Sequence, residues 1–183
     1  MANEITRVGF GQVEPNHLSA QTNGQIYAQL PVDTTTCGKI LENGRFLKYD
    51  YAAGKCNLTG DGEWMLVMNE IKLYDERRQG LKDYAMKATD FMGEVIVPRL
   101  LKTSVGDIYT TNCLGVANTS ETAEITASTS GVVSATVGTV LTVNSSTGYL
   151  KAAETSDEEF LWKVVKVYTM PDGQPGVKLQ RIA

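Results

Sequence analysis

Short apolar runs bounded by turn residues are the feature that most restricts the fold of this chain. The runs Trp64–Tyr74, Val95–Leu101 and Phe160–Thr169 are separated by segments rich in Gly, Pro, Asn and Asp. Strands with turn signals at near-regular intervals are typical of sandwiches and small barrels, whereas a helix needs a longer run with a 3.6-residue period. The sequence therefore predicts an all-β or mostly β fold of small β-sandwich or barrel units.

Two hairpins and one helical candidate stand out within this pattern. The aromatic-rich run Phe46–Tyr51 is followed by a Gly turn and a returning strand, and Phe160–Thr169 pairs naturally with Val177–Ile182 across a loop of Pro and Gly. Helix formers gather only in Asp75–Lys87, where Gly80 costs about 1 kcal/mol relative to Ala. We expect at most one short helix there, or else a long charged loop.

The composition divides the chain into three parts. Residues 1–40 are polar and turn-rich with isolated apolar residues, which predicts an extended, non-helical N-terminal arm. This arm either packs on its own domain as turns and edge strands or lies on a neighbouring subunit. Residues 41–104 form a first β-rich region and residues 105–183 a second β-rich domain. Within the second, the Ser/Thr-rich excursion 115–147 lacks aromatic residues, Lys and Arg and is expected to pack weakly.

Charge and length exclude several classes of partner. The 183 residues carry 17 Lys and Arg against 21 Asp and Glu, a net charge of −4. A chain without a basic surplus is a poor binder of phosphate backbones, so no nucleic-acid partner is expected. The chain opens without a charged region followed by an apolar one, and no run approaches 18 apolar residues. We expect a protein made in a cytoplasm and without a membrane partner.

The side chains that usually carry catalysis are sparse. His17 is the only histidine, and Cys37, Cys56 and Cys113 show no Cys-x-x-Cys spacing. No glycine-rich phosphate loop precedes a helix candidate. We therefore expect no enzyme, no metal and no cofactor, and we interpret the three cysteines as small buried apolar residues.

Two alternatives to a purely structural protein remain open. Paired carboxylates suffice for glycoside hydrolysis or calcium binding, and the chain offers Asp50, Asp61, Glu63, Asp75 and Glu76 near its turns. Aromatic side chains can form a sugar-stacking platform or belong to the core, and the candidates are Tyr49, Tyr51, Trp64, Tyr74 and Tyr84.

Short strand and turn segments along nearly the whole chain resemble those of a known family. They are Pro15–Ala20, Gly24–Leu30, Leu41–Asp50, Val105–Asn112 and Val167–Gln180. Together they resemble the head decoration proteins of tailed bacteriophages, which are also called auxiliary capsid or cement proteins. These segments are not catalytic signatures, so the resemblance implies no active-site residue.

The resemblance implies a structural virion protein that binds the capsid shell and stabilises it. Its implied partners are the major capsid protein and further copies of itself in a homo-oligomer, on the capsid surface of a virion assembled in the host cytoplasm. The alternative is a head fibre or tail protein that binds a host-surface glycan. Spaced apolar residues make the arm the expected contact segment, through Phe10, Val13, Pro15, Ile26, Tyr27 and Leu30. The excursion 115–147 is the alternative contact surface.

Overall fold

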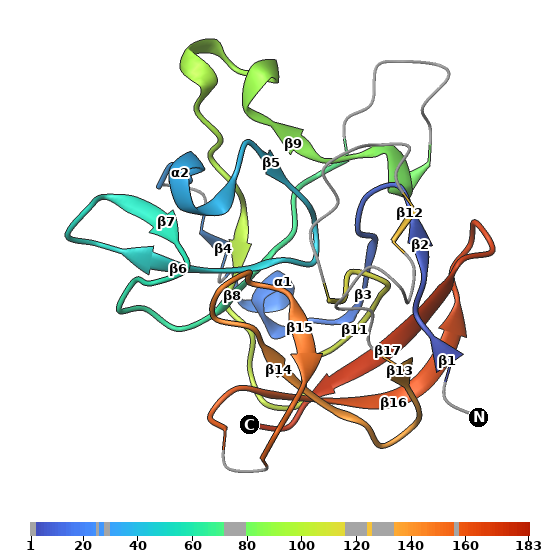
Figure 1. Ribbon diagram of the computed structural model, residues 1–183. Helices are drawn as coiled ribbons and strands as arrows, with labels where there is room; N and C mark the ends of the chain where they lie inside the picture. The colour runs from blue at the N-terminus through green and yellow to red at the C-terminus, as the bar shows by residue number, and fades with distance from the viewer. Residues whose placement is uncertain are drawn as a thin grey trace.

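Strands predominate in the computed structural model of the chain, which confirms the mostly β prediction (Figure 1). The structure describes residues 3–24, 26–27, 30–71, 80–115, 124–125, 134–155 and 158–183. Among these residues, no helix combines the length and the apolar character that a membrane span requires.

The smaller of the two main sheets is antiparallel and draws all of its strands from the first 101 residues. Its order is β4 (Ile26–Tyr27), β10 (Leu100–Leu101), β8 (Met65–Val67), β6 (Phe46–Asp50) and β7 (Lys55–Asn57). The predicted hairpin is confirmed, because β6 pairs with β7 across the turn at Gly54.

The larger main sheet takes five of its six strands from residues after 104. Its order is β15 (Leu150–Ala152), β14 (Val140–Val143), β16 (Leu161–Thr169), β17 (Pro175–Arg181), β11 (Ile108–Thr111) and β3 (Val13–His17). The long hairpin of β16 and β17 confirms the second predicted hairpin and contains a bulge between Val164 and Lys166. Along the chain, the strands change from the smaller to the larger sheet between β10 and β11, except that β3 of the larger sheet comes from the N-terminal segment.

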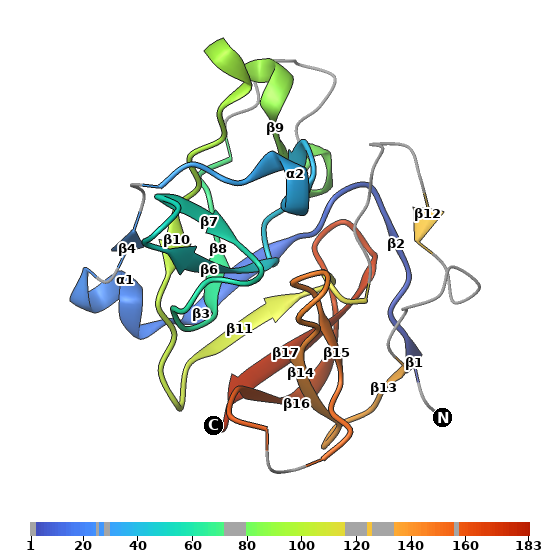
Figure 2. The ribbon, with the colours of Figure 1, turned by 60° about the vertical axis from the view of Figure 1, so that its left-hand side comes forward.

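Three two-stranded ladders complete the described sheets. They are β1 (Asn3–Glu4) with β13 (Ser134–Ala135), β2 (Arg7–Val8) with β12 (Glu124–Ile125), and β5 (Ile40–Leu41) with β9 (Met86–Lys87). The first two tie the start of the chain to the second region, as Figure 2 shows along β1 and β2.

Two apolar clusters lie on the opposite faces of the five-stranded sheet. Along β8, Leu66 belongs to the cluster shared with the six-stranded sheet, whereas Met65 and Val67 belong to the second cluster. Successive side chains of a strand point to opposite faces, so all three are buried only because both faces are covered. The first cluster joins the two sheets through Phe46, Leu66, Leu101, Tyr109, Trp162 and Leu179.

The helices differ in number and place from the expected single helix in Asp75–Lys87. Two short α-helices occur, α1 (Ser19–Asn23) and α2 (Thr34–Cys37), both within the segment expected to be non-helical. The Asp33 carboxylate caps α2 by accepting from Thr35 N at 3.2 Å, a local signal that stabilises a helix start.

The expected helix region itself contains little helix where it is described. Residues 72–79 lie outside the described part of the chain, Leu81–Asp83 forms the 3₁₀ turn η1, and β9 follows. Two further 3₁₀ turns, η2 (Ala88–Asp90) and η3 (Met92–Glu94), come next and project from the body of the molecule (Figures 1 and 2).

The N-terminal segment is built into the fold. Its strand β3 is an edge of the six-stranded sheet and pairs with β11. Four of its apolar side chains are fully or almost fully buried in the chain's own interior, namely Ile5, Phe10, Leu18 and Ala20. Of the two alternatives for this segment, the structure shows packing on its own domain, and an extended arm free to leave the body is not what residues 3–24 form.

Candidate functional site

The six predicted contact residues do not form one exposed apolar face. Phe10 is fully buried, and Val13 and Ile26 pack against the cluster between the sheets. Leu30 packs against the second cluster, and the side chain of Tyr27 lies outside the described part of the structure. Of the five side chains that the structure describes, only Pro15 is exposed, on the edge strand β3, where a residue without an N–H is tolerated.

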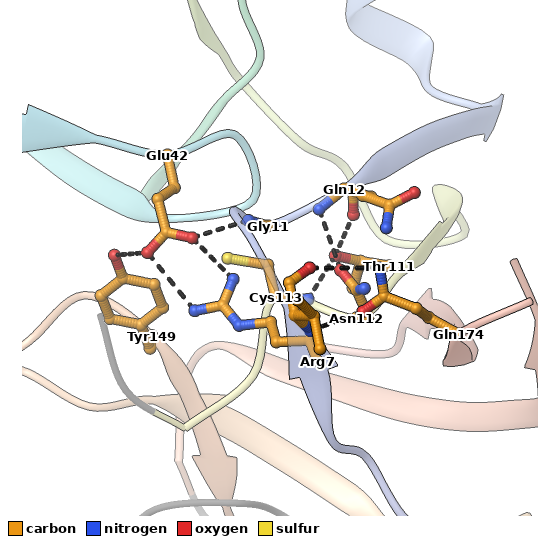
Figure 3. A network of polar contacts seen from close by, with 10 residues as sticks. Arg7, Gly11, Gln12, Glu42, Thr111, Asn112, Cys113, Tyr149 and Gln174 are labelled. Atoms are coloured by element: carbon orange, nitrogen blue, oxygen red, sulfur yellow. Dashed lines mark hydrogen bonds and ion pairs between the residues drawn. The ribbon is translucent and has the colours of Figure 1, made fainter. Parts of the chain in front are cut away.

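A buried ion pair fixes the N-terminal segment to the rest of the molecule (Figure 3). Arg7 Nη1 donates to Glu42 Oε2 at 2.6 Å, and neither side chain is exposed to solvent. The same carboxylate accepts from Gly11 N at 2.6 Å and from the Tyr149 hydroxyl at 2.8 Å. The Glu42 carboxylate thus joins three segments that are far apart in the sequence.

Close packing leaves no room for a ligand around this carboxylate. A Cβ atom at Gly11 would collide with Cys113 Sγ and with the Asn43 carbonyl oxygen. Burial by itself would lower the pKa of the Arg7 guanidinium, but Cys113, Glu42 and Tyr149 raise it above its usual range. The Arg7 guanidinium therefore stays charged, and the role of the pair is to hold the fold.

A second group of hydrogen bonds continues this network across the sheet (Figure 3). Gln12 N donates to Asn112 Oδ1 at 2.9 Å, and Thr111 Oγ1 donates to the Gln12 carbonyl at 2.6 Å. Gln174, in the loop between β16 and β17, accepts from Val8 N at 2.7 Å and donates to the Val8 carbonyl at 3.1 Å. These bonds use the backbone of the N-terminal segment and so hold it in place.

The sparse catalytic side chains do not converge. His17 is exposed at the end of β3, opposite Ile108. In the described part of the chain, no group of three or more His, Cys, Asp and Glu side chains could hold a metal ion. Asp50 accepts from Ala53 N and from Asn57 Nδ2, each at 2.9 Å, and so closes the turn between β6 and β7.

The three cysteines are expected to be unreactive in the folded protein. All three are buried and none forms a disulfide. Burial raises the pKa of the Cys56 and Cys113 thiols to about 12, so the thiolate that reacts with disulfide reagents is scarce at pH 8. We expect negligible labelling by Ellman's reagent in the native state and three labelled thiols in guanidinium chloride. Rapid labelling of the native protein would contradict this burial.

The remaining candidates from the sequence are divided between separate places in the fold. Tyr49 is buried and packs edge-on against the exposed Tyr51, with 5.6 Å between ring centroids. Asp61, Glu63 and Trp64 line a cleft between the two main sheets. Three other candidates, Tyr74, Asp75 and Glu76, fall outside the described residues. So do residues 116–123 and 126–133 of the excursion 115–147, which remains a predicted alternative contact surface.

An exposed apolar patch on the projecting 3₁₀ turns is the feature that the sequence interpretation missed. Met92 is 99% exposed, and Phe91, Val95 and Val97 are each 40% exposed or more. Beside this patch lies a pocket of about 510 Å³ whose lining includes Tyr84, Met86, Phe91 and Val97. The sequence signal for this patch was the run of three consecutive apolar residues Val95–Val97. An extended segment covered on one face can bury only alternate residues of such a run, and here Ile96 is the one that is buried.

Comparison with known proteins gives no match: no protein-family model, no curated protein and no solved structure is similar to this chain.

Proposed function

We propose that this chain is a structural virion protein that binds the shell of a tailed-phage head and stabilises it without catalysis or a cofactor. The resemblance to head decoration proteins gives the class, and the exposed apolar patch of Phe91, Met92, Val95 and Val97 is the observation that carries the proposal. Exposed apolar side chains gathered in one short segment, here residues 91–97, are a feature of surfaces that bind other proteins.

The patch has the composition of a protein interface. Its apolar side chains are flanked by two exposed ion pairs, Lys39 with Glu94 at 2.5 Å and Arg99 with Glu70 at 2.8 Å. An apolar centre with a polar rim is the usual arrangement at such interfaces. Because η2 and η3 project from the body, the patch can enter a depression between capsid subunits (Figure 1).

This surface replaces the N-terminal segment as the proposed contact with the major capsid protein. The spaced apolar residues of that segment are largely used inside the chain, whereas those of the patch are solvent-exposed. A protein that binds only the assembled shell stabilises it, because the bound copies must dissociate before the shell separates. Many copies with modest affinity are sufficient for this effect.

Replacing Met92 by Asp is expected to weaken binding to undecorated capsids of the encoding phage at least about tenfold, equivalent to about 1.4 kcal/mol. The charged side chain would have to be desolvated in the interface. Co-sedimentation of the variant with these capsids measures the effect. Since Met92 is almost fully exposed, the midpoint of thermal unfolding should not change.

Val105→Asp is the matched control, because Val105 is also an exposed apolar residue, at 67%, but lies outside both the patch and the excursion 115–147. We expect Val105→Asp to co-sediment as the original protein does. Equal binding by the original protein and by Met92→Asp would refute the patch as the contact surface.

A further inference from the structure

A cleft of about 670 Å³ lies where the two main sheets meet. The first sheet and the loop before β8 contribute Lys48, Asp61, Gly62, Glu63 and Trp64, and the second sheet and the segment before β16 contribute Thr142, Glu158, Glu159, Phe160 and Arg181. This volume is within the range of small-ligand sites, which occur preferentially between structural units.

The charges of the lining restrict the ligand. Four carboxylates, those of Asp61, Glu63, Glu158 and Glu159, face two cationic groups. Glu63 also pairs with Lys102, with 2.6 Å between its Oε1 and the Lys102 Nζ. Because carboxylates predominate, a phosphate or another anionic ligand would be repelled.

The cationic groups of the cleft are held in place by aromatic rings and hydrogen bonds. The Arg181 guanidinium lies 4.3 Å from the Phe160 ring centroid and donates from Nε to the Ala183 carbonyl at 3.0 Å. Lys48 Nζ lies 4.8 Å from the centroid of the Trp64 ring. Fixed donors of this kind lower the entropic cost of binding a ligand.

One carboxylate of the cleft is also fixed. Glu158 Oε1 accepts from Glu154 N at 3.3 Å. Hydrogen bonds from the Thr142 hydroxyl and from neighbouring backbone N–H groups keep the pKa of the Glu158 carboxyl below its ordinary value. Glu158 is therefore an ionised, oriented acceptor at neutral pH.

A peptide cannot bind here by adding a strand. The three strands that line the cleft are each paired on both sides: β6 with β7 and β8, β14 with β15 and β16, and β17 with β16 and β11. Strand addition requires an open edge with unpaired N–H and C=O groups. Recognition in the cleft must therefore proceed through side chains.

We propose that the cleft binds a neutral saccharide. Sugar hydroxyl groups can donate to the carboxylates of Asp61 and Glu159 and accept from Lys48 and Arg181, while the half-buried Trp64 side chain adds apolar surface to the lining beside Lys48. A ligand that alternates hydroxyl groups and C–H faces can contact both the polar and the apolar side chains of the cleft. An apolar ligand would remove water from the carboxylates of the cleft without replacing their hydrogen bonds.

This site is independent of the proposed capsid contact. The patch on η2 and η3 lies at the upper end of the molecule in Figures 1 and 2, whereas β14 and the C-terminal end of β17 lie at the lower end. A capsid-bound copy could therefore keep the cleft open to solvent. A result that refutes one of the two proposals therefore does not refute the other.

The two tryptophans give the binding test a local signal. Trp64 lines the cleft, whereas Trp162 is fully buried in the core. The full chain is titrated with maltotetraose, cellotetraose and tetra-N-acetylchitotetraose, with sialyllactose as an anionic probe and tetralysine as a cationic peptide. Tryptophan emission and saturation-transfer NMR of each probe are recorded in parallel.

We expect at least one neutral tetrasaccharide to bind with a dissociation constant on the order of 1 mM or below, and sialyllactose to bind at least about tenfold more weakly. Asp61→Asn should weaken the tetrasaccharide about fivefold or more, since it removes a charged acceptor. Glu70→Gln, an exposed acid outside the cleft, should leave its binding unchanged.

Three results would overturn the proposal. The first is the absence of both signals with all three neutral tetrasaccharides up to about 10 mM. The second is binding of tetralysine without binding of any saccharide, which would identify a site for cationic peptides. The third is a saccharide affinity that falls equally in Asp61→Asn and Glu70→Gln.

Discussion

A variant that lacks residues 1–12 is expected to be unfolded. The deletion removes the fully buried Phe10 and the almost fully buried Ile5, and truncating such a side chain alone costs about 2–5 kcal/mol. It also removes Arg7 and leaves the Glu42 carboxylate buried without its cationic partner. Together these losses are comparable to the whole stability of a typical domain, about 5–15 kcal/mol. Circular dichroism and thermal unfolding measure the outcome.

Single substitutions in the same segment show whether the loss of stability comes from lost core packing or from the shortening of the chain. Phe10→Ala should lower the free energy of unfolding by about 3–5 kcal/mol. His17→Ala is the control, because His17 is exposed at the sheet edge and its removal should cost less than about 0.5 kcal/mol. A soluble, cooperatively unfolding 13–183 variant would contradict the structure, because it would show that the N-terminal segment is dispensable for folding.

Replacing Glu42 by Gln is expected to lower the free energy of unfolding by about 3–5 kcal/mol, because the Arg7 guanidinium would remain buried without a counter-charge. The carboxylate also accepts from Gly11 N and from the Tyr149 hydroxyl, so its loss weakens three connections at once. For a chain of this length the unfolding midpoint should fall by roughly 6–20 °C. Urea unfolding of both proteins gives the free energies.

The double variant Arg7→Met with Glu42→Leu isolates the cost of an uncompensated charge. It should be more stable than either Arg7→Met or Glu42→Leu alone, because it removes both buried charges. Glu154→Gln breaks the exposed pair with Lys151, at 3.1 Å, and should cost less than about 1 kcal/mol. A loss below about 1 kcal/mol in Glu42→Gln would show that the buried pair does not hold the fold.

The parts of the fold that could be predicted from the sequence depend on local patterns. The β16–β17 hairpin follows from two apolar strands around a loop rich in Pro and Gly, and β6 with β7 follows from an aromatic strand and a Gly turn. Periodicity and turn chemistry act over a few residues, so they are visible in one sequence. The helix α2 was missed although its Asp33 cap was a local signal.

The buried ion pair could not be predicted from such patterns. Arg7 and Glu42 are 35 residues apart, and each is flanked by polar and apolar residues that resemble a surface turn. Charged residues are almost never fully buried unless paired, so the default expectation places both on the surface. Only the tertiary fold brings the two together and closes Gly11 and Tyr149 around them.

The two proposed binding surfaces also could not be predicted from the sequence, for different reasons. Val95–Leu101 was predicted as one strand, but only Leu100–Leu101 pairs in the described structure, which leaves Val95 and Val97 exposed. Asp61 was a candidate carboxylate, yet its neighbours across the cleft, such as Glu159 in the segment before β16, are about 100 residues away in the sequence. Which side chains are exposed, and which meet across the cleft, depends on tertiary packing and cannot be predicted from local periodicity.

We propose that this protein binds a phage head through the projecting patch. A cryo-EM map of capsids decorated with the purified protein is the most direct test of this binding. We expect density for the chain on the shell, with η2 and η3 and the side chains of Phe91 and Met92 facing the major capsid protein. Capsids that carry no such density, or a chain that contacts the shell through another face while the patch points to solvent, would contradict it.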